Sequence, residues 1–170
     1  MSDKIVNRVA NSKLITIDLE DFFPEEERVL FDIKKWLFAE QILKENDFRE
    51  SVKNHDWKIY QNKYIALTCS SDVIIPSWAY LLITVALSPY AKQIVIGSLN
   101  DLESAIFQKI ISELPLIDYK DKPIIIKGCS KKNIPETAYS QLIHELLPYA
   151  TSIMYGEACS SVPLYKNIKQ

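Results

Sequence analysis

Three cysteines are the residues of this chain whose type and spacing could do chemistry. Cys69 and Cys129 are each followed by a serine, and Cys159 comes three residues after Gly156. Thiolates bind zinc and iron–sulfur clusters, and a nearby cation or helix amino terminus lowers the pKa of a thiol toward the ligand form. Three protein ligands with an open fourth position are typical of a catalytic metal or of a cluster with one accessible iron. The sequence therefore predicts zinc or an iron–sulfur cluster bound by Cys69, Cys129 and Cys159.

Charged residues near these cysteines would complete such a site. Lys127, Lys131 and Lys132 flank Cys129, and their ammonium groups would offset the negative charge of the thiolates. A fourth ligand or supporting group is expected from one of four further residues: His55, Asp72, His144 and Glu157.

Two other interpretations of the cysteines stay open. Free cysteines are among the most buried residue types, so all three could be core residues of a protein that acts as a non-enzymatic interaction module. Alternatively, the protein is a thiol-dependent enzyme with Cys129 as nucleophile and His55 or His144 as its base. His55 stands beside Asp56, and such a pair is more often a helix cap than an acid–base pair.

A near-repeat of the sequence indicates where the cysteines lie. Residues 60–98 and 119–157 agree at many positions, among them Tyr60/Tyr119, Pro76/Pro135, Leu87/Leu146 and Gly97/Gly156. A slip of one residue inside the match also aligns Cys69-Ser70 with Cys129-Ser130. Both copies therefore carry a Cys-Ser pair at one structural position.

Each copy has the composition of a βαβ unit. The expected order of strand, helix and strand is 64–69, 76–91 and 93–97 in the first copy, and 123–129, 134–150 and 152–156 in the second. Because crossovers in a parallel sheet place helices on its faces, we expect a three-layer α/β sandwich with a mainly parallel, Rossmann-like sheet. Ligands of such sheets bind beyond the carboxyl ends of the strands, where Cys69 and Cys129 fall. The three thiols are therefore expected to converge.

The remaining segments extend this arrangement within one domain. Alternating apolar residues at 14–19 and 29–33 predict an amino-terminal β-hairpin, and a helix follows near 45–53. Asn100 and Glu103 resemble a capping box, which predicts a linking helix. The expected parts are 1–59 (amino-terminal extension), 60–98 (first repeat), 99–118 (linking helix), 119–157 (second repeat) and 158–170 (carboxy-terminal loop).

Composition excludes several classes of protein. With 48% hydrophobic and 25% charged residues, and a net charge of -2, the chain is typical of a soluble globular protein without the basic face that nucleic acids require. It has three glycines and no GxGxxG or Walker motif, so it has no nucleotide site of those types. Residues 1–4 are not followed by an apolar stretch typical of a signal peptide, so we expect a protein without a secretory signal, located in the cytoplasm.

The apolar stretch Trp78–Leu87 is about half as long as a membrane span and predicts a buried helix, not a membrane segment. A helix that is apolar nearly all round must be covered on both sides. The cover is either the amino-terminal hairpin or a second copy of the chain, in which case the protein is a homodimer.

Several stretches together resemble a Bacteroidetes family of uncharacterised proteins, a domain of unknown function. They are residues 14–20, 52–57, 76–80, 126–132 and 159–166. The resemblance implies no activity, but it points to iron–sulfur assembly proteins as expected partners, because genes of such proteins often lie near assembly genes. The expected architecture is also similar to that of quinolinate synthase, in which each pseudo-repeat supplies one cysteine to a central cluster.

Overall fold

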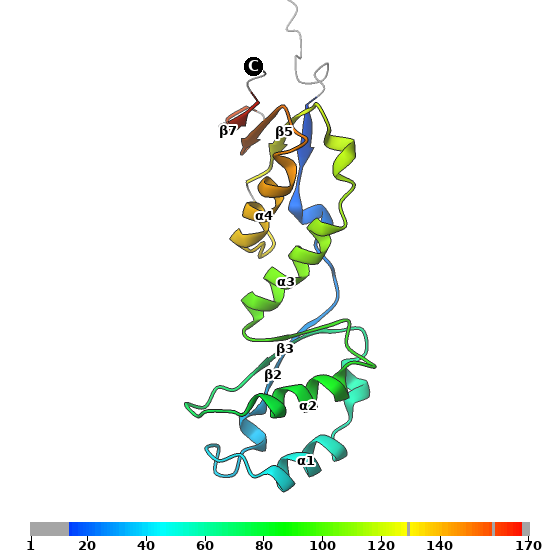
Figure 1. Ribbon diagram of the computed structural model, residues 1–170, viewed down its shortest axis with the longest axis vertical. Coiled ribbons are helices and arrows are strands. Elements are labelled where there is room, and N and C mark those ends of the chain that lie inside the picture. Colours follow the sequence, from blue (N-terminus) through cyan, green and yellow to red (C-terminus); the bar gives the residue numbers. More distant parts are fainter. Residues whose placement is uncertain (1–13, 129, 158, 168–170) are drawn as a thin grey trace, which may run out of the picture. The chain divides into compact units, whose positions relative to one another are not determined.

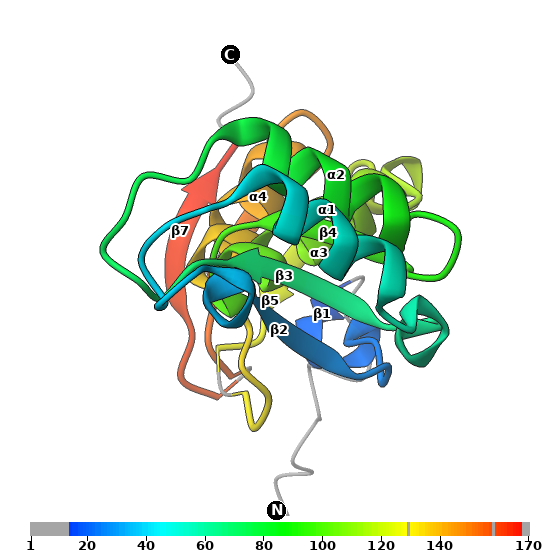
Figure 2. The ribbon, with the colours of Figure 1, turned by 90° about the horizontal axis from the view of Figure 1, so that it is seen from below.

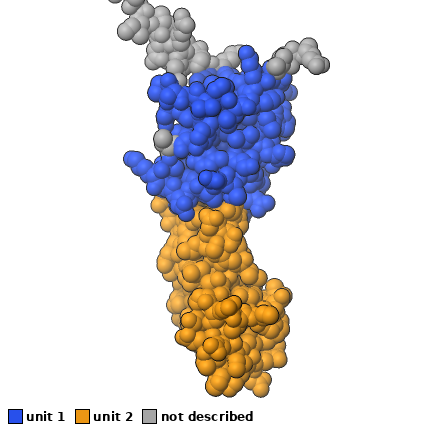
Figure 3. Space-filling model, turned by 90° about the vertical axis from the view of Figure 1, so that its left-hand side faces the viewer, with its two compact units in different colours: residues 1–23, 107–170 blue, residues 24–106 orange. Residues whose placement is uncertain are grey.

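The computed structural model describes residues 14–128, 130–157 and 159–167. Its helices and strands are labelled in Figure 1. The chain divides into two compact units, which Figure 3 shows in different colours. Residues 24–106 form one of them, here called the inserted unit, and the segments on either side form the second, here called the discontinuous unit. Each unit is built around its own sheet.

The sheet of the inserted unit has three strands in the order β2-β3-β4. Neighbouring strands are parallel, and the register places Phe31 beside Leu67 and Leu67 beside Ile96. Parallel strands need long crossover connections, and helices provide them here. The elements in chain order are β2 (Arg28–Asp32), η2 (Ile33–Trp36), α1 (Glu45–Asn54), η3 (Trp57–Tyr60), β3 (Tyr64–Thr68), α2 (Ser77–Leu87) and β4 (Gln93–Ile96).

The helices α1 and α2 lie on one face of this sheet (Figure 2). α1 has acidic residues in its first turn and a lysine in its last, which suits the helix dipole, and it buries Phe48 and Val52. α2 buries Ala79, Ile83 and Leu87 at intervals of four residues. Both stripes pack against β2 and β3 in one hydrophobic core.

The outer side of α2 is also apolar. The helix contains no charged residue, and the side chains of Leu81 and Val85 are 56% and 71% exposed. Trp78 and Leu82 are half-buried beside them. Among the helices of the described residues, none has both the length and the apolar content that a bilayer crossing requires.

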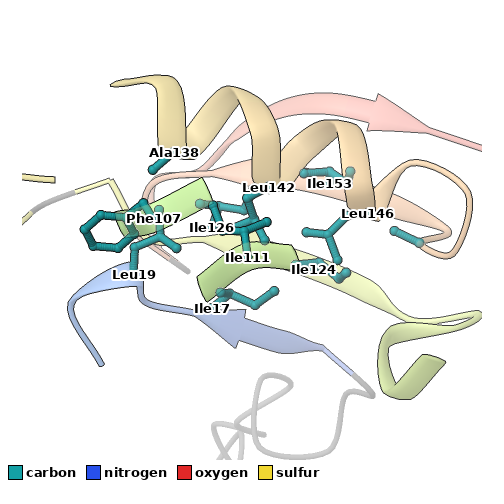
Figure 4. Packing of buried hydrophobic residues seen from close by; sticks show 11 residues of the cluster. Ile17, Leu19, Phe107, Ile111, Ile124, Ile126, Ala138, Leu142, Leu146 and Ile153 are labelled. Carbon is teal, nitrogen blue, oxygen red and sulfur yellow. The ribbon is translucent and has the colours of Figure 1, made fainter. Parts of the chain in front are cut away.

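The sheet of the discontinuous unit has the order β1-β5-β6-β7. Its first three strands are parallel, and β7 pairs antiparallel with β6. Figure 4 shows Leu142 and Leu146 of one helix directed toward Ile124 and Ile126 of β5, all four in one buried cluster. The remaining elements in chain order are β1 (Ile15–Ile17), η1 (Leu19–Phe22), α3 (Leu99–Ser112), η4 (Leu116–Tyr119), β5 (Pro123–Ile126), α4 (Glu136–Leu146), β6 (Ser152–Tyr155) and β7 (Val162–Lys166).

The two units share one topology. In each, a first strand pairs in parallel with a middle strand, which a helix joins to a third parallel strand. The registers agree, because Ile17 lies beside Ile126 just as Phe31 lies beside Leu67. The internal repeat therefore includes the two first strands, β1 and β2.

Turns before the middle strands repeat as well. Asn62 and Asp121 both have left-handed backbone conformations, with φ of 60° and 58°. Their amides donate to the carbonyl oxygens of Tyr90 and Tyr149, at 2.9 Å in both cases. Asn and Asp tolerate this conformation better than most residues, so the same turn forms twice.

The predicted α/β class with mainly parallel strands is confirmed, as are the strands and helices of both repeats, the helix near 45–53 and the linking helix. The predicted amino-terminal hairpin is wrong: β1 pairs with β5, and β2 pairs with β3. The strands form two sheets, whereas a single sheet was expected. The physical reason is that each repeat supplies only two parallel strands. A strand from the amino-terminal segment extends each pair to three, and a three-stranded sheet with an apolar face is more stable by itself than a two-stranded one.

Candidate functional site

An aspartate stands at the end of the first strand in each unit. Asp18 follows β1, and Asp32 is the last residue of β2. Each carboxylate accepts a hydrogen bond from the amide two residues later, from Glu20 at 3.0 Å and from Lys34 at 2.9 Å. Both aspartates thereby cap a 3-10 turn at the carboxyl edge of a sheet, which is the usual place for a ligand in an open α/β fold.

In the inserted unit, Asp32 also holds the Cys-Ser loop that follows β3. The amide of Ser70 donates to Asp32 Oδ1 at 3.1 Å. Cys69, directly before it, is half-buried, forms no disulfide and packs against the hydrophobic core. Its thiol is therefore presented at a strand end by a loop that is hydrogen-bonded in place.

The surroundings of Asp32 stabilise its negative charge. Burial by itself would raise its pKa, but hydrogen bonds from Ser70 and from the Lys34 amide, together with the Lys34 charge, hold the pKa below its usual value. Asp32 is therefore a carboxylate at neutral pH.

Cys69 lies within electrostatic reach of two further groups. The hydrogen bond and charge of Glu40 raise the pKa of Lys34, and the charges of Asp32 and Cys69 add to this effect. Burial raises the pKa of Tyr80, and the charges of Cys69 and Asp32 raise it further. The thiol thus shares the carboxyl edge with an ammonium group and a phenol.

In the discontinuous unit, Glu20 holds the matching loop. The hydroxyl of Ser130 and the amide of Lys132 donate to Glu20 Oε1 at 2.8 and 2.9 Å, and the amide of Lys131 donates to the same oxygen. The Ser130 hydroxyl, followed by the Lys132 amide, lowers the pKa of Glu20. The loop thus surrounds a carboxylate with three donors. Cys129 itself lies outside the described residues.

The three lysines predicted to balance the thiolates have other contacts. Lys127 Nζ lies 2.6 Å from Asp18 Oδ2, and this hydrogen bond raises the pKa of Lys127. The ammonium of Lys132 lies 4.8 Å from the centre of the Phe23 ring, and Lys131 is exposed. Their role beside thiolates stays a prediction.

The predicted metal ligands are distributed over both units. Cys69 belongs to the inserted unit, and Cys159, which is exposed, belongs to the discontinuous unit. Within the described ranges, no three His, Cys, Asp or Glu side chains are grouped so that they could hold a metal ion. The convergence of the three thiols therefore stays a prediction.

The predicted fourth ligands are likewise divided between the two units. Asp72 and His55 lie in the inserted unit, whereas His144 and Glu157 lie in the discontinuous unit. Asp72, His144 and Glu157 are exposed, and His144 stands on α4. The charge of Glu157 contributes to the raised pKa of Lys127. Their roles as ligands stay predictions.

His55 is part of an aromatic cluster. Its ring lies 4.7 Å from the Trp57 ring and 5.3 Å from the Trp36 ring, between centroids, and Nε2 lies 3.0 Å from the Tyr60 hydroxyl. Burial lowers the pKa of His55, and the charge of Lys35 lowers it further. These contacts support packing as the role of this imidazole. Its alternative role as the base for Cys129 stays a prediction.

A cavity of about 630 Å³ lies at the carboxyl edge of the inserted unit. It is lined by the turn at residues 39–42, the loop at residues 70–73 and Lys34. This volume is in the usual range for small-molecule pockets, and the location is the usual one for α/β folds.

Three groups that support this edge were not predicted from the sequence: Asp32, Lys34 and Glu40. A signal for Asp32 exists: Ile-Asp-Leu at 17–19 and Phe-Asp-Ile at 31–33 share an apolar-Asp-apolar pattern. These segments are fourteen residues apart, whereas the later repeats are fifty-nine apart. A comparison at a single offset therefore cannot find both.

Fold and site together define a duplicated, parallel α/β protein in which a Cys-Ser sequence follows the middle strand of each unit. The family model described as "Protein of unknown function (DUF2480)" matches residues 3–167. The chain belongs to this family, which confirms the resemblance to an uncharacterised domain family. No curated protein and no solved structure matches the chain.

Proposed function

We propose that this protein binds a metal ion or an iron–sulfur cluster through cysteine thiolates at the carboxyl edges of its sheets. The observation that carries the proposal is the duplicated loop support. A carboxylate near the end of the first strand holds the Cys-Ser loop in both units: Asp32, the last residue of β2, through Ser70, and Glu20, in the turn after β1, through Ser130. Cysteines that only fill a core need no such support. The expected partners are iron–sulfur assembly proteins, in a cytoplasm whose reducing conditions keep thiols free.

Cys129 is the decisive ligand in this proposal. Within the described ranges no three metal-ligating side chains are grouped, and we accordingly assign the site to a set of ligands that includes Cys129. Cys129 supplies a thiolate of the kind that zinc and iron prefer. Its loop is held by Glu20 on the carboxyl side, which would limit the cost of ordering the ligand.

Replacing Cys129 by serine is expected to abolish metal retention with only a modest loss of stability, because serine removes the thiolate and conserves most of the volume. The measurement is the metal and sulfide content, with an absorption spectrum, of tag-free protein purified without oxygen. Iron with sulfide and visible charge-transfer bands would identify a cluster. Zinc alone would identify a thiolate metal site.

Ser160→Ala is the matched control, because Ser160 is exposed and adjoins Cys159. Cys69→Ser and Cys159→Ser test whether all three thiols contribute. Stoichiometric metal in Cys129→Ser contradicts the proposal. So does a well-folded wild-type protein that stays metal-free and colourless after reconstitution with iron, sulfide and zinc.

A second function, that of a homodimeric interaction module, is favoured by the outer face of α2. Exposed contiguous apolar side chains mark interaction sites, and Leu81 and Val85 lie four residues apart on this face. In this case the cysteines would be structural.

If α2 forms the dimer, Leu81→Glu is expected to convert a dimer into a monomer, because it buries an unpaired charge in the interface. The measurement is light scattering on the eluate of a sizing column. Ile59→Glu is the control, because Ile59 is 52% exposed on the same unit but lies outside α2. A monomeric wild-type protein would exclude this function.

A further inference from the structure

The two units differ at one position of the carboxyl edge. Glu20 stands two residues after the capping Asp18, and Lys34 stands two residues after the capping Asp32. The strand registers make these two positions equivalent. In the discontinuous unit, the Glu20 carboxylate accepts hydrogen bonds from the loop after the middle strand. In the inserted unit, a lysine takes its place, and the matching loop borders the cavity.

The loop of the inserted unit carries backbone donors at residues that line this cavity. Ser70, Ser71 and Asp72 line the cavity together with Lys34. Within the described ranges, no acceptor is hydrogen-bonded to the amide of Ser71 or of Asp72. By the alignment of the two Cys-Ser pairs, these amides correspond to those that bind Glu20. Backbone amides beside an ammonium group form a favourable site for a carboxylate.

The turn at residues 39–42 contributes one carboxylate, that of Glu40, to the lining of the cavity. Glu40 lies on a turn in which Ala39 and Glu40 have φ of 49° and 58°, and the hydroxyl of Ser71 donates to the Glu40 carbonyl oxygen at 2.6 Å. Lys34 Nζ lies 2.9 Å from Glu40 Oε2, whose side chain is 66% exposed. A ligand carboxylate that pairs with Lys34 would leave Glu40 available to a ligand ammonium. Asp72 adds a second carboxylate to the lining, which disfavours a simple anion.

We propose that this cavity binds a small zwitterion of the amino-acid class. The carboxylate of the ligand lies between Lys34 and the loop at 70–72 and accepts hydrogen bonds from that loop, as the Glu20 carboxylate does in the other unit. The ammonium group of the ligand pairs with Glu40 and Asp72. The cavity of about 630 Å³ is large enough for such a molecule. This inference uses no cysteine, and among the predicted metal ligands it shares only Asp72, a candidate for the fourth position.

The variant Lys34→Glu tests the proposal, because it places a carboxylate where the other unit has Glu20. This carboxylate would accept the hydrogen bonds of the loop at 70–72 in place of the ligand carboxylate. The probes are the common L-amino acids, titrated at millimolar concentration into the full-length, ¹⁵N-labelled protein. At least one is expected to shift the amide resonances of Ser71 and Asp72. In Lys34→Glu its Kd is expected to rise by about tenfold or more, because a charge-assisted hydrogen bond is lost. Lys58→Glu makes the same charge change at an exposed position outside the cavity and is expected to bind as the wild type does.

The absence of a shift at Ser71 and Asp72 with every amino acid overturns the proposal, as does an unchanged Kd in Lys34→Glu. Acetate and methylamine each present one of the two charged groups. If either binds as tightly as the amino acid, the zwitterion is rejected. Mapping of the wild-type resonances does not depend on any variant, and Lys34→Met, with the same expected loss, replaces Lys34→Glu if that variant does not fold.

Discussion

Replacing Glu103 by leucine is expected to lower the free energy of unfolding of the inserted unit by about 3–5 kcal/mol, the usual cost of breaking a buried ion pair from one side. Arg28 Nε donates to Glu103 Oε1 at 2.7 Å, and the two side chains are only 15% and 9% exposed. The guanidinium also donates to the carbonyl oxygens of Pro24 and Glu26, at 2.5 and 2.6 Å. These bonds hold the arginine in place, so loss of Glu103 leaves a poorly solvated charge.

Tryptophan fluorescence during urea unfolding is the appropriate measurement, because all three tryptophans, Trp36, Trp57 and Trp78, lie in the inserted unit. Glu50→Leu is the control, since Glu50 is exposed on α1. The double variant of Glu103→Leu with Arg28→Met is expected to regain part of the loss, because it removes both charges. A loss of less than about 1 kcal/mol in the single variant would contradict the structural assignment of this pair.

Phe48→Ala is expected to cost about 3–5 kcal/mol in the same unit, because truncation of a buried phenylalanine removes apolar contacts and leaves a cavity. Phe48 is 0% exposed. Its ring centre lies 5.7 Å from that of Trp36 and 5.8 Å from that of Trp78, nearly edge-on in both cases. The ring therefore joins α1 to both α2 and the turn after β2.

The measurement is again tryptophan fluorescence in urea, and the emission itself should change because two of the reporters contact the deleted ring. Phe38→Ala is the matched control, since Phe38 is 53% exposed in the same unit, and we expect it to cost less than about 1 kcal/mol. Equal unfolding midpoints for the two variants would show that Phe48 does not hold this core together.

The position of Cys69 was predictable from the sequence, whereas its surroundings were not. An apolar, β-rich run before Cys69 and a proline-initiated helix after it are local signals, and together they predict a strand end. The hydrogen bond from Ser70 to Asp32 joins residues that are 38 positions apart, and no local pattern indicates it. The cavity has the same origin, because the hydroxyl of Ser71 meets the carbonyl of Glu40 across 31 positions.

The sequence by itself determined the elements of each repeat, because apolar periodicity and turn residues such as Asn62 act over a few neighbouring positions. It also determined that a Cys-Ser pair follows each middle strand. Only the tertiary structure decided how the amino-terminal strands pair. The alternation in β1 and β2 is equally compatible with a hairpin, but Ile17 pairs with Ile126 and Phe31 with Leu67. These long-range ladders prevail because each adds an apolar strand to a parallel pair that is too narrow to bury its own face, and that gain in burial depends on residues far apart in the chain.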